Sequence, residues 1–134
     1  MSEQGGGMEV IRAQESGARR GERFTGTAWV EALFKSQRPG GMRVYRVFFE
    51  PGARTHWHAH DGEQTLYVVE GRGRVSTSGG LGREIAPGDI VYIGPGEKHW
   101  HGAGPGSALI HLAVTTGKET AWMEEVTDDE YTQA

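Results

Sequence analysis

The chain has 134 residues, of which 36% are hydrophobic and 24% are charged, and its formal net charge is −4. This composition is typical of one soluble globular domain, and a negative charge without a dense Lys/Arg tract excludes a nucleic-acid partner. No apolar run approaches the roughly 18 residues of a membrane span, and the lack of cysteine excludes disulfides and thiolate metal sites. Because the opening residues have neither the basic nor the apolar region of a signal peptide, we expect a cytoplasmic protein.

Turn signals divide the chain into short segments. All five prolines are followed by glycine, and this pair fits a tight turn because proline fixes φ and glycine adopts positive φ. Together with other glycine-rich turns, these signals recur roughly every 8 to 12 residues, which is typical of an all-β sandwich or barrel. The segments between them are rich in β-branched and aromatic residues, which predicts strands at 43–49, 65–69, 90–93 and 108–114.

The remaining segments complete the predicted organisation. We expect residues 1–7 to be a disordered extension and residues 8–134 to form a single domain. The Gly79-Gly80 pair predicts a tight hairpin between strands 74–78 and 81–85. Near the end of the chain, Thr127 and Glu130 have the spacing of a capping box, which predicts one short C-terminal helical turn.

The first of two histidine clusters contains His56, His58 and His60. On an extended chain these three side chains share one face, while Trp57 points the other way and is predicted to pack in the barrel. Two imidazoles two residues apart on one strand can converge on a single cation. A polar strand that faces solvent is the alternative interpretation of this cluster.

This cluster resembles the first motif of the cupin family, which runs Gly, five residues, His-x-His, three or four residues, Glu, six residues, Gly. Counting from Gly52 reaches His58 and then His60. Gln64 stands in the place of the family's Glu, and Gly71 falls on the closing glycine.

The second cluster resembles the second cupin motif, which runs Gly, five residues, Pro-x-Gly, two residues, His, three residues, Asn. Counting from Gly88 reaches Gly94 in the place of the proline, then Gly96 and His99, and finally Ala103 in the place of the asparagine. The two departures are at positions that shape loops, so His99 keeps its place as a ligand. The resemblance implies a cupin fold, which is a double-stranded β-helix or jelly-roll barrel, with a metal-site core at about 43–115.

A narrower resemblance runs from Met8 to the end of the chain. It is to the small single-domain bacterial cupins that include manganese-dependent hydroxynitrile lyases and are similar to the cupins associated with carboxymuconolactone decarboxylases. His56 departs from the pattern, because we expect a small residue there in these proteins. The resemblance implies four metal ligands, which are His58, His60, Gln64 and His99.

Three imidazoles and an amide oxygen are neutral ligands that suit a transition metal better than calcium or magnesium. We expect one divalent ion, for which the resemblance implies manganese first, with iron, zinc or nickel as alternatives. His101 and His111 are candidates for proton transfer, because the pKa of histidine lies near neutrality. A histidine satisfied by hydrogen bonds in the core is the alternative interpretation of His111, which lies in the apolar run 108–114.

These observations predict a metal-dependent enzyme that acts on a small organic molecule. The narrower resemblance implies the most specific form of this prediction, a hydroxynitrile lyase that converts a cyanohydrin into a carbonyl compound and cyanide. One alternative is a non-haem iron dioxygenase, and another is a non-catalytic protein that binds a metal or a small molecule. We also expect a homodimer, with apolar residues between 8 and 35 as candidates for its interface.

Overall fold

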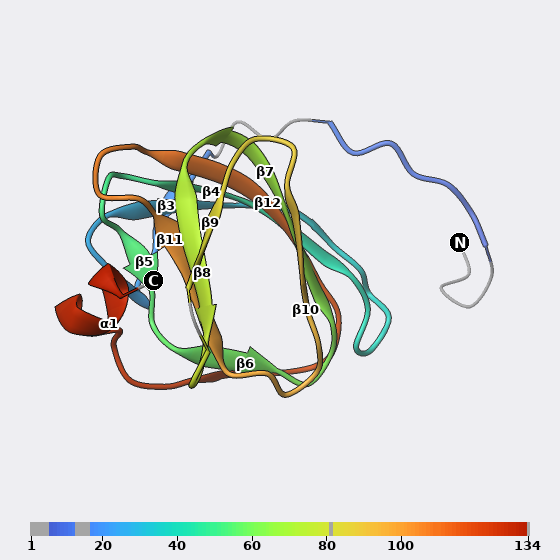
Figure 1. Cartoon of the computed structure of the whole chain (residues 1–134). Coiled ribbons are helices and arrows are strands. Elements are labelled where there is room, and N and C mark those ends of the chain that lie inside the picture. The colour runs from blue at the N-terminus through green and yellow to red at the C-terminus, as the bar shows by residue number, and fades with distance from the viewer. Residues whose placement is uncertain (1–5, 13–16, 81, 134) are drawn as a thin grey trace.

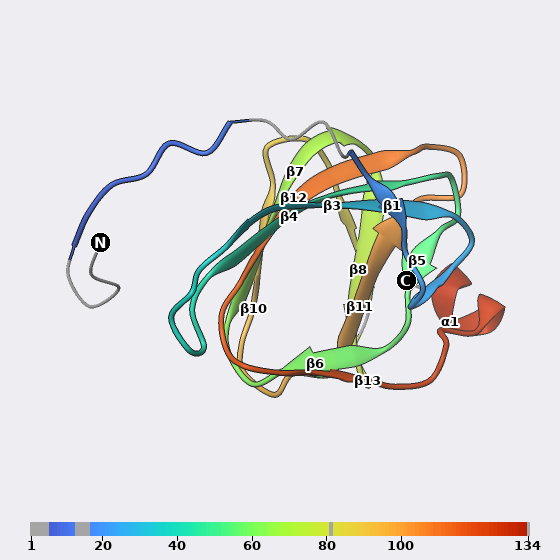
Figure 2. The same ribbon diagram turned by 180° about the vertical axis from the view of Figure 1, so that it is seen from behind.

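The structure is a computed structural model that describes residues 6–12, 17–80 and 82–133. In this part of the chain, two curved antiparallel sheets face each other as a jelly-roll barrel, with a single short helix beside it (Figure 1). The predicted all-β class is therefore confirmed. Most of the extension expected at residues 1–7 lies outside the described residues, and residues 6–12 lead away from the barrel without forming a strand (Figure 2).

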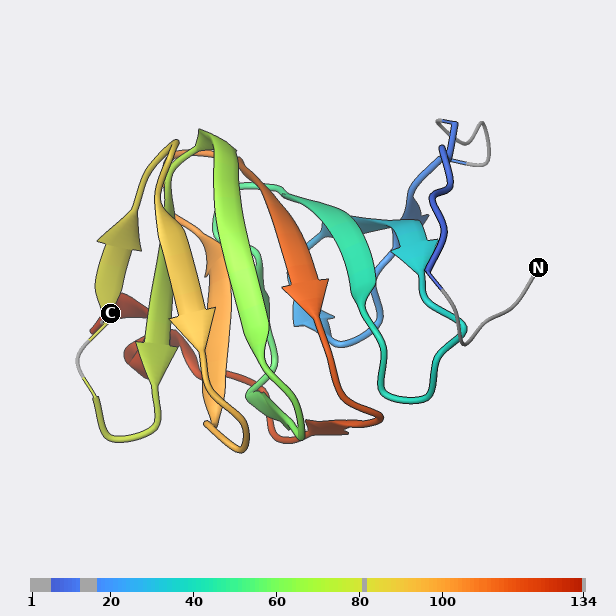
Figure 3. The same cartoon turned by 90° about the vertical axis from the view of Figure 1, so that its right-hand side faces the viewer.

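The first sheet supplies one wall of the barrel. In Figure 3 four of its strands lie side by side, from gold β10 through green β7 and orange-red β12 to teal β4. The order of its six strands is β1 (Arg19–Arg20), β3 (Ala28–Lys35), β4 (Arg43–Phe49), β12 (Leu109–Thr115), β7 (Gln64–Gly71) and β10 (Ile90–Ile93).

Strand β12 shows why this sheet has an inner and an outer face. Its burial alternates strictly along the strand, and the buried side chains are those of Leu109, His111, Ala113 and Thr115. Because directly paired residues point to the same face, the pairing of β12 with β4 and β7 defines rows of inward side chains. Two of these rows are Arg43–Thr115–Gln64 and Val47–His111–Val68.

The second sheet supplies the opposite wall. Its central path consists of β13 (Thr120–Trp122), β6 (His58–His60), β11 (His99–Ala103), β5 (Arg54–Thr55) and β2 (Phe24–Thr25). Strand β8 (Gly73–Thr77) also pairs with β11 and carries β9 (Arg83–Ile85) at its other edge. Every residue of β6 and β11 is buried, because β6 and β11 have one face toward the barrel interior and the other under the C-terminal segment.

A separate apolar cluster packs the C-terminal helix against the outer face of this sheet. Helix α1 (Asp128–Thr132) begins with the predicted capping box, in which Thr127 and Glu130 bond to each other's backbone N–H. Its Tyr131 packs with Trp57 and Trp100, and the Tyr131 hydroxyl donates to the carbonyl oxygen of Ala103 at 2.6 Å. The prediction that Trp57 packs away from the histidines is therefore confirmed.

The turns lie where the Pro-Gly pairs of the sequence predict them. All five Pro-Gly pairs lie in turns, and the glycines of four pairs have positive φ. Gly71, the closing glycine of the first motif, has φ of 85°, and a Cβ there would collide with the backbone at Ala108. This glycine therefore lets β7 approach the start of β12.

Some boundaries differ from the prediction. Strand β7 is longer than 65–69, β12 is shifted by one residue from 108–114, and β8 and β9 are joined by a longer connection than a tight two-residue hairpin. A turn between Thr77 and Gly80 ends β8 early, because the N–H of Gly80 donates to the carbonyl oxygen of Thr77. Apolar side chains such as Trp29 are exposed, and the homodimer stays a prediction. The described chain holds no helix of the length and apolarity needed to cross a membrane.

Candidate metal centre

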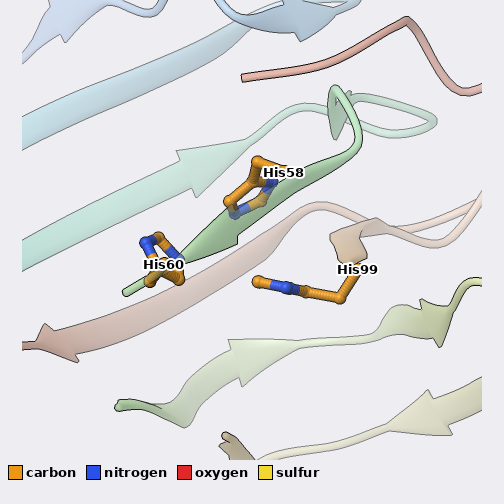
Figure 4. A group of neighbouring side chains, drawn as sticks. All are labelled: His58, His60 and His99. Atoms are coloured by element: carbon orange, nitrogen blue, oxygen red, sulfur yellow. The ribbon is translucent and has the colours of Figure 1, made fainter. Parts of the chain in front are cut away.

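Three histidines from two neighbouring strands meet inside the barrel. His58 and His60 lie two residues apart on β6, so their side chains share its inner face, and His99 at the start of β11 is paired in register with His58. Figure 4 shows the three rings gathered in the space between these strands. One nitrogen from each ring lies within 4.8 Å of the other two, and all three residues are buried.

Hydrogen bonds to backbone carbonyls orient two of the rings. Nδ1 of His58 bonds to the carbonyl oxygen of His56 at 2.8 Å, and Nδ1 of His99 bonds to that of Glu97 at 2.8 Å. Because a carbonyl only accepts, each Nδ1 carries the proton, and each neutral ring keeps its lone pair on Nε2. This arrangement is usual for imidazoles that bind metals.

His60 completes the group of rings. Its Nδ1 is hydrogen-bonded to the hydroxyl of Thr120 at 3.0 Å, and its Nε2 is buried with no hydrogen-bond partner among the described residues. A buried polar atom without a partner costs free energy unless something binds it. The atom is therefore placed as a metal ligand would be.

Gln64 on β7 brings an oxygen to the same point. Its Nε2 donates to the hydroxyl of Thr115 at 2.8 Å, which turns Oε1 toward Nε2 of His99 at 3.3 Å. With the proton of His99 on Nδ1, two lone pairs face each other there, and a cation between them would relieve the repulsion. Ligands at about 2.1 Å from one ion lie roughly 3 to 4 Å apart, so the 3.3 Å between Oε1 of Gln64 and Nε2 of His99 fits a shared metal.

Burial keeps the imidazoles neutral. It lowers the pKa of His58 to about 2, with a further contribution from the charge of His99. Burial and the charge of His99 also lower the pKa of His60 to about 4, and burial lowers that of His99. Near neutral pH all three rings are therefore in the form that binds metals.

The two other predicted residues form a pair next to this group. Nε2 of His111 on β12 lies 3.1 Å from Nδ1 of His101 on β11, and the ring of His101 is 5.3 Å from that of His58. Phe49 packs edge-on against both rings of the pair. Burial lowers the pKa of His111 to about 4, and burial followed by the charge of His111 lowers that of His101 well below its usual value.

A cavity of about 460 Å³ joins the two groups, with His58, His60, Gln64, His101 and His111 in its lining. This volume suits a small organic molecule. The structure thus brings together all six residues predicted for the site. His56 is half-buried, and the contact that links it to the site is made by its backbone carbonyl.

Several neighbours of the site were not predicted. Trp122 on β13 packs against His58 with ring centroids 4.6 Å apart, because β13 pairs with β6 and places the two residues opposite each other. Thr115 and Thr120 hold Gln64 and His60, respectively. The alternation of β12 could have revealed Thr115, which is the next inward residue after Ala113.

A barrel of two facing antiparallel sheets with three converging imidazoles defines a jelly-roll protein with a candidate metal centre. The chain belongs to the cupin family, because the family described as "Cupin domain" matches residues 45–115. It is 47% identical over 129 residues to an (R)-mandelonitrile lyase of Granulicella tundricola, in an alignment that covers 92% of this chain and 98% of that protein.

Solved structures agree on the fold. A cupin-like protein from Thermotoga maritima is 38% identical, with a TM-score of 0.84 over 94% of this chain and 97% of that one. The polyketide cyclase RemF from Streptomyces resistomycificus has a TM-score of 0.70 over 94% of each chain. Its identity of 20% shows the shared fold alone.

Proposed function

We propose that the protein is a divalent-metal-dependent hydroxynitrile lyase, which cleaves a cyanohydrin into a carbonyl compound and hydrogen cyanide. The observation that carries this proposal is the shared cavity, which the His101–His111 pair lines together with three of the candidate ligands, His58, His60 and Gln64. The 47% identity to an (R)-mandelonitrile lyase over nearly the whole chain supports this choice of reaction.

The proposed ligands are His58, His60, Gln64 and His99, and manganese is the expected ion, with iron, zinc or nickel as alternatives. Such an ion would supply positive charge that polarises an oxygen bound beside it. Because all four ligands are neutral, the protein leaves that charge uncompensated. Six-fold coordination would leave two positions open for substrate or water.

The histidine pair can hold a base in either of two proton arrangements. If Nε2 of His111 donates to Nδ1 of His101, the free lone pair is on Nδ1 of His111, which is buried without a partner among the described residues. In the reverse arrangement the free lone pair is on Nε2 of His101, which is also buried and unpaired there. The depressed pKa of each ring keeps the pair neutral near pH 7, so one lone pair is free for the reaction, while the same burial makes the ring a weaker base.

The reaction then needs one proton to move from oxygen to carbon. His111 accepts the hydroxyl proton of the cyanohydrin, and the electron pair left on oxygen forms the carbonyl π bond. The bond between the carbinol carbon and the nitrile carbon breaks, and its electron pair leaves with cyanide. The protonated pair returns the proton to cyanide, directly or through His101, so that hydrogen cyanide leaves and both imidazoles are again neutral.

The test compares metal-loaded and chelator-treated protein for cyanide release from (R)-mandelonitrile, with each candidate metal added back separately. We expect release above the spontaneous rate that disappears on chelation and returns with manganese. Oxygen uptake with Fe(II) and a phenolic or diketone substrate, without cyanide release, would favour the dioxygenase and contradict the proposal. Binding of mandelonitrile without turnover of any substrate would favour a non-catalytic protein.

A further inference from the structure

The lining of the site cavity is more basic than the rest of the protein. It includes Arg20, Arg23 and Arg43 against one carboxylate residue, Glu22. The chain as a whole has the opposite balance, with 18 acidic and 14 basic residues. A cavity rich in one sign of charge attracts ligands of the other sign.

Arg43 is the arginine that reaches the interior of the barrel. It is paired in register with Thr115, which is paired in turn with Gln64, so the three side chains point to the same inner face. Nη1 of Arg43 donates to the carbonyl oxygen of Gly117 at 2.5 Å, which anchors the guanidinium. Since a guanidinium has five N–H groups, this bond leaves donors for a second acceptor.

The charged groups that the structure describes around Arg43 do not occupy its remaining N–H donors. Asp61 lies close enough to feel its charge, but the Asp61 carboxylate accepts backbone N–H bonds from Lys118 and Glu119 at 2.8 and 3.2 Å. His60, on the ligand side, is kept neutral by burial. Among the described residues, the Arg43 guanidinium forms no ion pair with the Asp61 carboxylate.

A second arginine is placed over the aromatic wall of the cavity. The guanidinium of Arg23 lies 5.9 Å from the ring centroid of Trp122, and Trp122 packs against His58. Arg20, the third arginine, is exposed and bonds to the hydroxyl of Thr27 at 3.4 Å. These two side chains add positive potential on the solvent side of the cavity.

We propose that the substrate carries a carboxylate group and that Arg43 binds this group through paired N–H donors. Planar guanidinium and carboxylate groups match each other in two parallel hydrogen bonds. The substrate class is then a carboxylated cyanohydrin, together with the corresponding carboxylated aldehyde. The cyanohydrin part of this inference rests on the proposed function, whereas the carboxylate part rests on Arg43 in the cavity lining.

The test uses two unreactive probes of the same shape, 4-(hydroxymethyl)benzoate and its neutral counterpart 4-(hydroxymethyl)benzamide. Isothermal titration calorimetry on the metal-loaded protein measures the affinity of each. We expect the acid to bind at least roughly tenfold more tightly than the amide, because a charge-assisted bidentate pair replaces neutral hydrogen bonds. Raising the salt concentration should reduce this ratio.

Two variants on strand β4 locate the effect. Arg43→Gln should bring the ratio close to one, whereas Arg46→Gln should keep the wild-type ratio. Arg46 is a matched control because it is exposed on the same strand and pairs with Leu112, on the outer face of β12. A wild-type ratio near one, or a ratio that Arg43→Gln leaves unchanged, would overturn the proposal.

A crystal structure of the wild-type protein with the benzoate probe tests whether Arg43 binds the carboxylate, even if Arg43→Gln fails to fold. We expect both carboxylate oxygens within hydrogen-bond distance of the Arg43 guanidinium. A carboxylate bound only to the metal, or bound elsewhere, would overturn the proposal. Neither measurement involves cyanide, so a failed lyase assay with a retained acid preference would refute the proposed function alone.

Discussion

The Nε2 atom of His111 and the Nδ1 atom of His101 lie 3.1 Å apart, although the two residues come from different sheets. The bond crosses the interior of the barrel beneath Phe49, and both rings are buried. This hydrogen bond joins the two sheets beside the cavity and the candidate ligands. The pair thus combines a packing role with the proton-transfer role proposed for it.

Replacing His111 with alanine separates these two roles. If His111 is the general base, the rate of cyanohydrin cleavage should fall by roughly 100-fold or more. The metal content should stay at the wild-type level, because His111 lies outside the group of converging ligand atoms. Steady-state cyanide release and elemental analysis on the same sample check both parts, and wild-type turnover would remove His111 from the mechanism.

Thr115→Val tests the orientation of Gln64. The substitution keeps the shape of the side chain but removes the oxygen that accepts from Nε2 of Gln64. We expect metal affinity to fall by roughly 10- to 100-fold, as is typical when a partner of a ligand is lost. Competition with a chelating dye measures the affinity, and Thr65→Val, a matched change on the outer face of β7, should have no effect.

His56→Ala should leave both metal content and cyanide release unchanged. The carbonyl oxygen that orients His58 belongs to the backbone of His56, so alanine retains it. Loss of metal on this substitution would show that the imidazole of His56 joins the site. Elemental analysis against the wild-type protein is the measurement.

The buried His111 also makes stability depend on pH. Its pKa is about 4 in the folded protein and returns to about 6.5 on unfolding, so between these values the unfolded chain binds a proton that the folded chain excludes. The free energy of unfolding of metal-free protein should therefore be unaffected above pH 6.5 and fall as pH drops toward 4, by about 3 kcal/mol from this group. Urea unfolding should show a smaller fall in His111→Gln, and equal falls would refute the assignment.

Much of the site was predictable because both motifs lie on short stretches of regular strand. The spacing of two residues placed His58 and His60 on one face, and turn glycines such as Gly71 fixed where the strands begin and end. Helix α1 was predictable because its capping box is local in sequence.

The contacts that were missed depend on pairing between distant segments. Strand β3 contains helix-forming residues such as Ala32 and Leu33 and is a strand because it pairs with β4. Trp122 reaches His58 only through the pairing of β13 with β6. The sequence places Arg43 in a strand, but the inward direction of its side chain follows from the register with Thr115.

In the proposed function, cyanohydrin cleavage requires a metal held by this histidine cluster. His58→Ala removes one of the proposed ligands, and metal content and cyanide release from (R)-mandelonitrile are measured on the same preparation. We predict about one ion per chain and measurable release in the wild-type protein, and loss of both in a folded variant. A His58→Ala protein that retained its metal and its activity would show that this cluster is not the required metal site.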